Sequence, residues 1–86
     1  MANQSLEVLK LSVLFDNHFF NGVPTQVHFT QNSDMVGTWI DEQGAANLSI
    51  GLDRIQFMSN DQLAFLIAHE YGHLVLKHPE KTVEIQ

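Results

Sequence analysis

The segment from Ser59 to His78 constrains the fold most, because as a helix it would be apolar on nearly every side. Ser59 with Gln62 three residues later has the spacing of a capping box, and Asp61 lies where the helix dipole favours a negative charge. Pro79 disfavours helical geometry in the residue before it, which predicts that the helix ends near His78. Such a helix belongs in the middle of a small domain.

The other elements follow from hydrophobic periodicity and turn residues. Apolar residues recur at helical spacing over Ser5–Phe20, which predicts a helix with a broad buried face that ends at Asn21-Gly22. Alternating patterns predict strands over 25–30, 36–41 and 47–52, and the stretch 53–58 fits either a strand extension or a turn. The sequence therefore predicts one α+β domain over 1–86. It has an N-terminal backing helix, a small three-stranded, mostly antiparallel sheet and a buried C-terminal helix.

Composition excludes several classes of protein. The chain has 86 residues, which fits a single small domain, and it contains no cysteine, which excludes disulfide scaffolds and zinc ribbons. Four basic residues stand against ten acidic ones, for a net charge of -6, so we expect no nucleic-acid partner. There is no signal-peptide pattern and no apolar run long enough for a membrane span, so we expect a cytoplasmic protein without a membrane partner.

The polar residues of the apolar helix form the sequence His69-Glu70-Tyr71-Gly72-His73. Positions four apart on a helix are separated by about 40° of rotation, so His69 and His73 can point at one metal ion. Glu70 is turned by about 100° from His69, which places its carboxylate beside the ion, where it can take a proton from a metal-activated water. Burying these three side chains is costly unless something pairs with them, and a metal does so directly. We predict Tyr71 in the core and Gly72 where the helix lies close to the sheet.

The segment Ala68–Leu74, followed by Leu76-Lys77-His78, resembles the active-site helix of small zincin metallopeptidases of the gluzincin type. The similar groups are the ImmA/IrrE-like, SprT-like and HtpX-like proteins, and the resemblance covers about half of the chain. It implies a zinc cofactor, a backing helix and a small sheet. It also implies that extended peptide binds along an exposed sheet edge, for which we predict Val36–Ile40. Trp39 on this strand is predicted in the core or at its rim.

The third metal ligand is the open question, since catalytic zinc normally has three protein ligands. In the resembling families this ligand lies well downstream of the helix, often a glutamate. We favour Glu80 or Glu84 over His78, which a continuous helix would turn away, and His28 is an outside candidate. A second copy or a partner chain could also complete the metal site.

These residues lead to one hypothesis and two alternatives. The hypothesis is a zinc-dependent metallopeptidase acting on a peptide or protein substrate, with His69 and His73 as metal ligands and Glu70 as general base. The first alternative is a catalytically inactive zincin-like domain that binds a peptide or protein. The second is a small acidic protein that mimics or inhibits a partner. The chain could also be a fragment of a longer enzyme.

Overall fold

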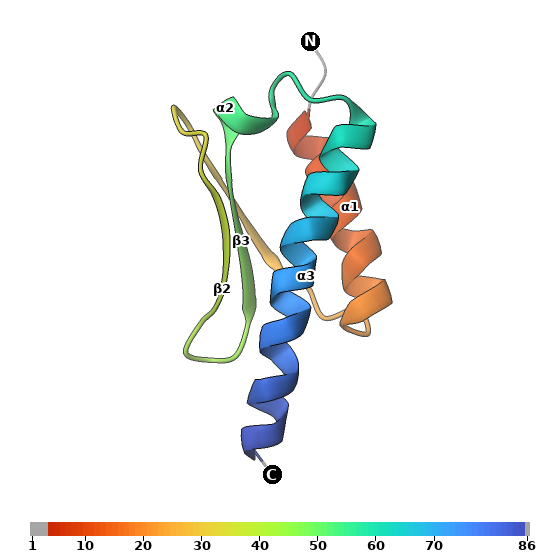
Figure 1. Cartoon of the computed structure of the whole chain (residues 1–86), viewed down its shortest axis with the longest axis vertical. Helices are drawn as coiled ribbons and strands as arrows, with labels where there is room; N and C mark the ends of the chain where they lie inside the picture. The colour runs from red at the N-terminus through yellow and green to blue at the C-terminus, as the bar shows by residue number, and fades with distance from the viewer. Residues whose placement is uncertain (1–3, 86) are drawn as a thin grey trace.

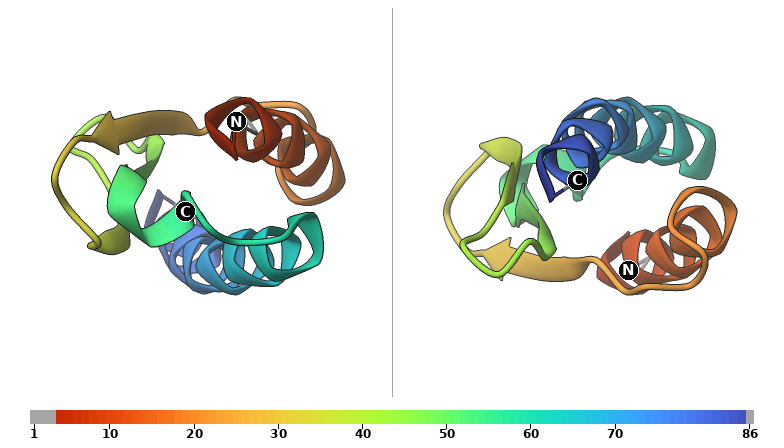
Figure 2. Two further views of the ribbon diagram at one scale, coloured as in Figure 1. Left: turned by 90° about the horizontal axis from the view of Figure 1, so that it is seen from above. Right: turned by 90° about the horizontal axis from the view of Figure 1, so that it is seen from below.

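The structure is a computed structural model that describes residues 4–85, with side chains over 4–77. The elements in chain order are α1 (Gln4–Phe19), β1 (Gln26–Thr30), β2 (Val36–Ile40), β3 (Ala46–Gly51), α2 (Leu52–Ile55) and α3 (Asn60–Ile85). Helices α1 and α3 lie side by side on the same side of the sheet (Figures 1 and 2). This arrangement confirms the predicted α+β fold with a backing helix, three strands and a C-terminal helix.

The sheet has the strand order β1-β3-β2, so β3 lies in its centre. β1 runs parallel to β3 and β2 runs antiparallel to it, which makes the sheet mixed. The observed strand bounds lie within one residue of the predicted ones. Leu48 and Ile50 are fully buried because they point from the central strand toward the helices, whereas His28 and Trp39 lie on outer strands and are exposed.

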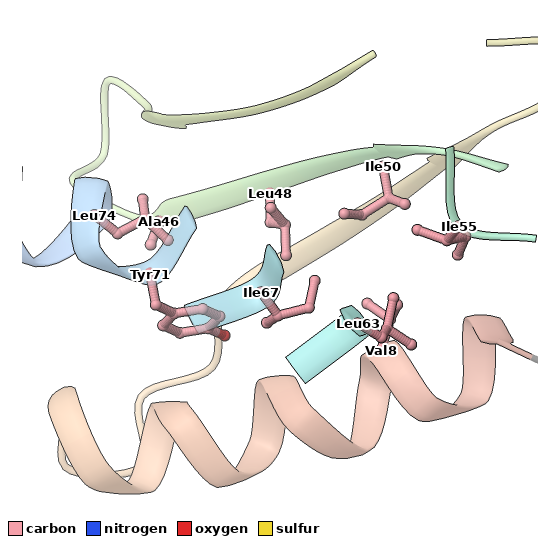
Figure 3. Close-up of a cluster of buried hydrophobic side chains, with 9 residues drawn as sticks. All are labelled: Val8, Ala46, Leu48, Ile50, Ile55, Leu63, Ile67, Tyr71 and Leu74. Atoms are coloured by element: carbon pink, nitrogen blue, oxygen red, sulfur yellow. The ribbon is translucent and has the colours of Figure 1, made fainter. Parts of the chain in front are cut away.

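The hydrophobic core fills the space between β3, α1 and α3 (Figure 3). α3 contributes most of it, with four side chains at helical spacing that are completely inaccessible to solvent. The core residues are Val8, Ala46, Leu48, Ile50, Ile55, Leu63, Ile67, Tyr71 and Leu74. This packing fixes the rotation of α3 about its axis, and therefore the direction in which its polar residues point.

α3 begins as predicted and ends later than predicted. The Ser59 amide donates to Gln62 Oε1 (2.9 Å) and the Gln62 amide donates to Ser59 Oγ (3.2 Å), which confirms the capping box. The helix continues past Pro79 to Ile85, so the predicted end near His78 is wrong. Proline biases the preceding residue away from helical geometry but does not forbid it, and helices that continue through a proline are the known exception. The last turns of α3 extend beyond the sheet (Figure 1).

α1 buries a different face from the one that its apolar residues predict. Its buried side chains are Gln4, Val8, Ser12 and Asp16, a row with a spacing of four. The apolar side chains of Leu6, Leu9, Val13, Leu14 and Phe19 are exposed instead. Ser12 and Asp16 face inward because they make buried hydrogen bonds to α3 and to Thr25, the residue before β1, which apolar periodicity cannot reveal. Asn21 and Gly22 have positive φ and end the helix as predicted.

Among the residues that the structure describes, no helix combines the length and the apolar character needed to cross a membrane.

Gly51 allows the connection between β1 and β2 to lie against the end of β3. A Cβ atom built on Gly51 would lie 2.3 Å from the Ser33 carbonyl oxygen and 2.8 Å from the Met35 nitrogen. Both are main-chain atoms, so the whole connection would have to move. We expect Gly51→Ala to lower the free energy of unfolding by about 1–3 kcal/mol, as overpacking does in well-packed cores. Urea denaturation followed by circular dichroism would measure the change.

Gly37→Ala is the matched control for this prediction, since a Cβ atom at Gly37 would have nothing within 4 Å. Gly37 also lies in a strand, where alanine costs no backbone strain. Equal stability of the two variants would show that the close approach at Gly51 is relieved without cost.

Candidate metal and peptide site

His69 and His73 lie one helical turn apart on an exposed side of α3. Their ring centroids are 4.8 Å apart and the ring planes are 86° from each other. Both side chains are exposed, since Ile67, Tyr71 and Leu74 turn the opposite side of the helix into the core. The structure thus brings the two predicted ligands together and leaves their imidazole rings accessible.

Glu70 differs from its two histidine neighbours because it is buried, with an exposed fraction of 9%. Within the described part of the chain, no hydrogen bond or ion pair satisfies its carboxyl group. A buried carboxyl group without a partner is costly, and proteins usually satisfy such groups with a hydrogen bond, an opposite charge or a metal. The carboxyl group of Glu70 is therefore an unused acceptor on the same turn of α3 as the two imidazole rings.

The described side chains do not supply a third ligand. Among them, no three His, Cys, Asp or Glu residues gather closely enough to hold a metal ion. The outside candidate His28 lies elsewhere: its Nε2 is 2.9 Å from Asn47 Oδ1, and its ring stacks on Trp39 with centroids 5.5 Å apart. The structure does not bring His28 to the pair formed by His69 and His73.

The side chains of His78, Glu80 and Glu84 lie outside the described part of the structure. Their backbone belongs to α3. With a rise of about 1.5 Å per residue, the Cα atoms of Glu80 and Glu84 lie about 10 Å and 16 Å along the helix axis from that of His73. A continuous helix therefore favours a third ligand from another segment over either glutamate.

On the outer face of the sheet, a series of side-chain hydrogen bonds runs from β1 to the loop after β2. Asn47 donates through Nδ2 to Asp41 Oδ2 (3.2 Å), so its Oδ1 is left to accept from His28 Nε2. Hydrogen bonds to the Asp41 carboxylate, first from the Ala45 amide and then from the Asn47 side chain, hold the pKa of Asp41 below its usual value. These hydrogen bonds account for the position of the His28 side chain without any metal.

β2 is an edge strand, as the predicted substrate edge requires. The Gly51 amide donates to the Met35 carbonyl (2.7 Å) and the Asp41 amide donates to the Ala45 carbonyl (3.0 Å). The pairs Met35–Gly51 and Asp41–Ala45 continue the register of β2 and β3 at its two ends. Along an antiparallel ladder, hydrogen-bonded pairs alternate with pairs that are not hydrogen-bonded. The odd-numbered residues of β2 therefore direct their main-chain groups toward β3. The residues that direct them toward the free edge are Val36, Thr38 and Ile40.

A buried polar cluster, which the sequence did not predict, joins α3 to α1. Tyr71 is fully buried as predicted, and its hydroxyl group donates to Asp16 Oδ1 (2.8 Å) and lies 2.6 Å from Ser12 Oγ (Figure 3 shows Tyr71). Asp16 also accepts from the Thr25 amide (3.0 Å) and from Thr25 Oγ1 (2.7 Å). Burial raises the pKa of Tyr71 to about 12, so the hydroxyl group keeps its proton at physiological pH. The only indication of this cluster in the sequence was the spacing of four between two polar residues, Ser12 and Asp16, in the predicted helix.

A pocket of about 640 Å³ lies beside His69, between α3 and the residues around α2. Its lining includes Met58, Phe65 and Leu66 as apolar side chains, with Arg54 among the polar ones. Phe65 is 78% exposed and Leu76 is 72% exposed, so α3 is covered along one face only. The pocket gives the neighbourhood of His69 an apolar surface.

Gly72 lies on the solvent-exposed face of α3, and a Cβ atom built on it would have nothing within 4 Å. The prediction that Gly72 lets the helix approach the sheet is therefore wrong. Helix rotation explains the error: Gly72 is about 200° from Leu74, which points into the core.

The comparison with protein families gives one match. The model of peptidase family M48 matches residues 29–86, about two thirds of the chain. The matched region contains the end of β1 and the whole of β2, β3, α2 and α3. No curated protein and no solved structure matches the chain. The match does not separate the ImmA/IrrE-like, SprT-like and HtpX-like resemblances, which stay predictions.

Proposed function

The chain belongs to peptidase family M48, a family of zinc metallopeptidases, and from this membership we propose that it hydrolyses peptide bonds with Glu70 as general base. The observation that supports the proposal most is the placement on one helix of two adjacent, exposed imidazole rings and a buried, unpartnered carboxyl group. This donor set fits zinc, which binds imidazole nitrogen and commonly keeps histidine ligands in catalytic sites. His69 and His73 would hold the ion.

Zinc, when bound, would polarise the scissile carbonyl group and acidify a water. The residues of the chain provide the rest. Glu70 accepts the proton of the attacking water and passes it to the leaving amine. Tyr71 anchors α3 to α1 through Asp16, and this contact keeps the preceding residue, Glu70, in a fixed orientation.

The free edge of β2 is the proposed binding surface for an extended peptide or protein substrate. A peptide strand would pair with the outward main-chain groups of Val36, Thr38 and Ile40, while side chains on alternate positions face α3. The apolar pocket beside His69 suits a large apolar side chain of the substrate. We propose that a third ligand comes from another segment of the protein or from a partner chain, and Glu80 and Glu84 stay the alternative candidates from the sequence.

The second candidate is a zincin-like binding module without catalysis. It is favoured by one observation, the absence of a third ligand among the described side chains. Two histidines alone hold zinc weakly and leave the metal poorly oriented. The buried Glu70 favours the peptidase, since a binding module gains nothing from a buried carboxyl group without a partner.

Metal content distinguishes the two functions. We expect protein purified without added metal to contain stoichiometric zinc by mass spectrometry, and His73→Ala to lose it, because one imidazole cannot retain the ion. His18→Ala is the control, since His18 is also exposed but lies at the end of α1. A folded protein without zinc would contradict the peptidase and favour the binding module.

A further inference from the structure

Lys77 of α3 reaches the free edge of β2. Its ammonium group donates to the Thr38 carbonyl oxygen (3.0 Å) and lies 3.4 Å from Thr38 Oγ1. Thr38 is the central residue of the strand, and its carbonyl group points away from β3, as the ladder register shows. Lys77 therefore occupies the middle main-chain acceptor of the edge that the proposed substrate needs.

Lys77 also lies beside the metal and catalytic residues. It follows His73 by four positions and Glu70 by seven, so rotations of about 40° and 20° separate it from them along the same side of the helix. A peptide paired with β2 would run past all three residues. The ammonium group would then be close to the peptide backbone and to side chains near Thr38.

We infer that Lys77 is a specificity-determining residue that caps the Thr38 carbonyl group and selects peptides with an acidic side chain opposite it. The inference rests on the proposed docking of peptide on β2. A peptide N–H group that pairs with the Thr38 carbonyl oxygen displaces the ammonium group, which loses a charge-assisted hydrogen bond. A glutamate or aspartate on the peptide restores an ionic partner, whereas an uncharged side chain does not.

Lysine on a sheet edge has a simpler use, which is to block pairing between edges of different molecules. The two uses differ in what they predict. An edge block acts against every incoming strand alike, whereas the inferred role gives a preference for acidic peptides that disappears when the ammonium group is removed.

The experiment measures binding of two short, blocked, threonine- and valine-rich peptides that are identical except for a central glutamate or glutamine. Trp39 is the single tryptophan of the chain, it is 43% exposed, and it is adjacent to Thr38, so its fluorescence reports docking on β2. Binding is measured on protein from which bound metal has been removed with a chelator, so that no cleavage occurs. The variants are Lys77→Met, which keeps a long helix-forming side chain, and Lys10→Met, an exposed lysine of α1 that controls for net charge.

We expect the starting protein and Lys10→Met to bind the glutamate peptide about threefold to fivefold more tightly than the glutamine peptide, as for an exposed ion pair. Lys77→Met should show no preference, and it should bind the glutamine peptide more tightly than the starting protein does, because the cap is gone. An unchanged preference in Lys77→Met would overturn the inference and leave peptide docking intact. Absence of binding by every variant would overturn both docking on β2 and the role of Lys77, while zinc content would still test the peptidase separately.

Discussion

Replacement of Glu70 by glutamine is expected to lower the rate of peptide hydrolysis by the zinc-loaded protein by about 100-fold or more, the usual contribution of a general base. Glutamine has nearly the same shape as glutamate but cannot accept the proton of the attacking water. The metal should stay bound, because His69 and His73 are unchanged. Cleavage of β-casein, an unfolded substrate, followed by mass spectrometry would measure the rate, and zinc content would be measured on the same samples.

Glu42→Gln is the control for this experiment, since Glu42 is exposed in the loop between β2 and β3 and the substitution changes the net charge equally. We expect its hydrolysis rate to match that of the unsubstituted protein. If Glu70→Gln cleaved β-casein at an undiminished rate with zinc bound, the carboxyl group would have no role in proton transfer. If it lost zinc, Glu70 would be a ligand of the metal.

The largest loss of stability is expected for Asp16→Ala. The substitution leaves the Thr25 amide, the Thr25 hydroxyl group and the Tyr71 hydroxyl group without their shared acceptor in a buried place. Each unsatisfied buried donor costs about 1–3 kcal/mol, and Ser12 can still serve Tyr71, so we expect a loss of roughly 2–4 kcal/mol in the free energy of unfolding. Urea denaturation followed by circular dichroism would measure it.

Asn17→Ala is the matched comparison, because Asn17 is the next residue of α1 and its side chain is exposed. Its expected effect is within about 0.5 kcal/mol. If Asp16→Ala were no less stable than Asn17→Ala, the three donors would find other acceptors, and the cluster would not anchor α3.

Most of the fold was predictable because its elements have clear local signals. The capping box at Ser59 and the left-handed Asn21-Gly22 ending of α1 are local, and both are confirmed. The alternation of apolar and polar residues in β1 matches the observed burial, since Val27 and Phe29 are half-buried and their neighbours are exposed. In each case a few adjacent residues determine the backbone geometry.

The errors come from partners that lie far away in the sequence. The inward face of α1 depends on Tyr71, which lies on α3, and on Thr25, which immediately precedes β1. The predicted length of α3 rested on the tendency of a proline to end a helix, whereas the observed helix continues through Pro79. The exposed position of Gly72 depends on which face of α3 the sheet covers, and an apolar composition on all sides gives no indication of that.

For the candidate site, helix geometry alone predicted that His69 and His73 lie together. The contact between Lys77 and Thr38 could not be predicted, since it depends on how close β2 lies to α3, and the burial of Glu70 depends on which side of α3 the rest of the fold covers. The roles of His69, Glu70 and His73, and of Glu80 and Glu84 as ligands, stay predictions for the metal measurement.

The central position of β3 has a consequence for the order of folding. β2 and β3 are joined by a short loop, whereas partners in β1 and β3, such as Gln26 and Asn47, are far apart in the chain. Closing the longer loop costs more conformational entropy, so we expect the hairpin of β2 and β3 to form first and β1 to add last. Until then β3 has an unpaired side, onto which β1 of another molecule could dock. The slow step of folding would therefore also be the one at which two chains can exchange strands.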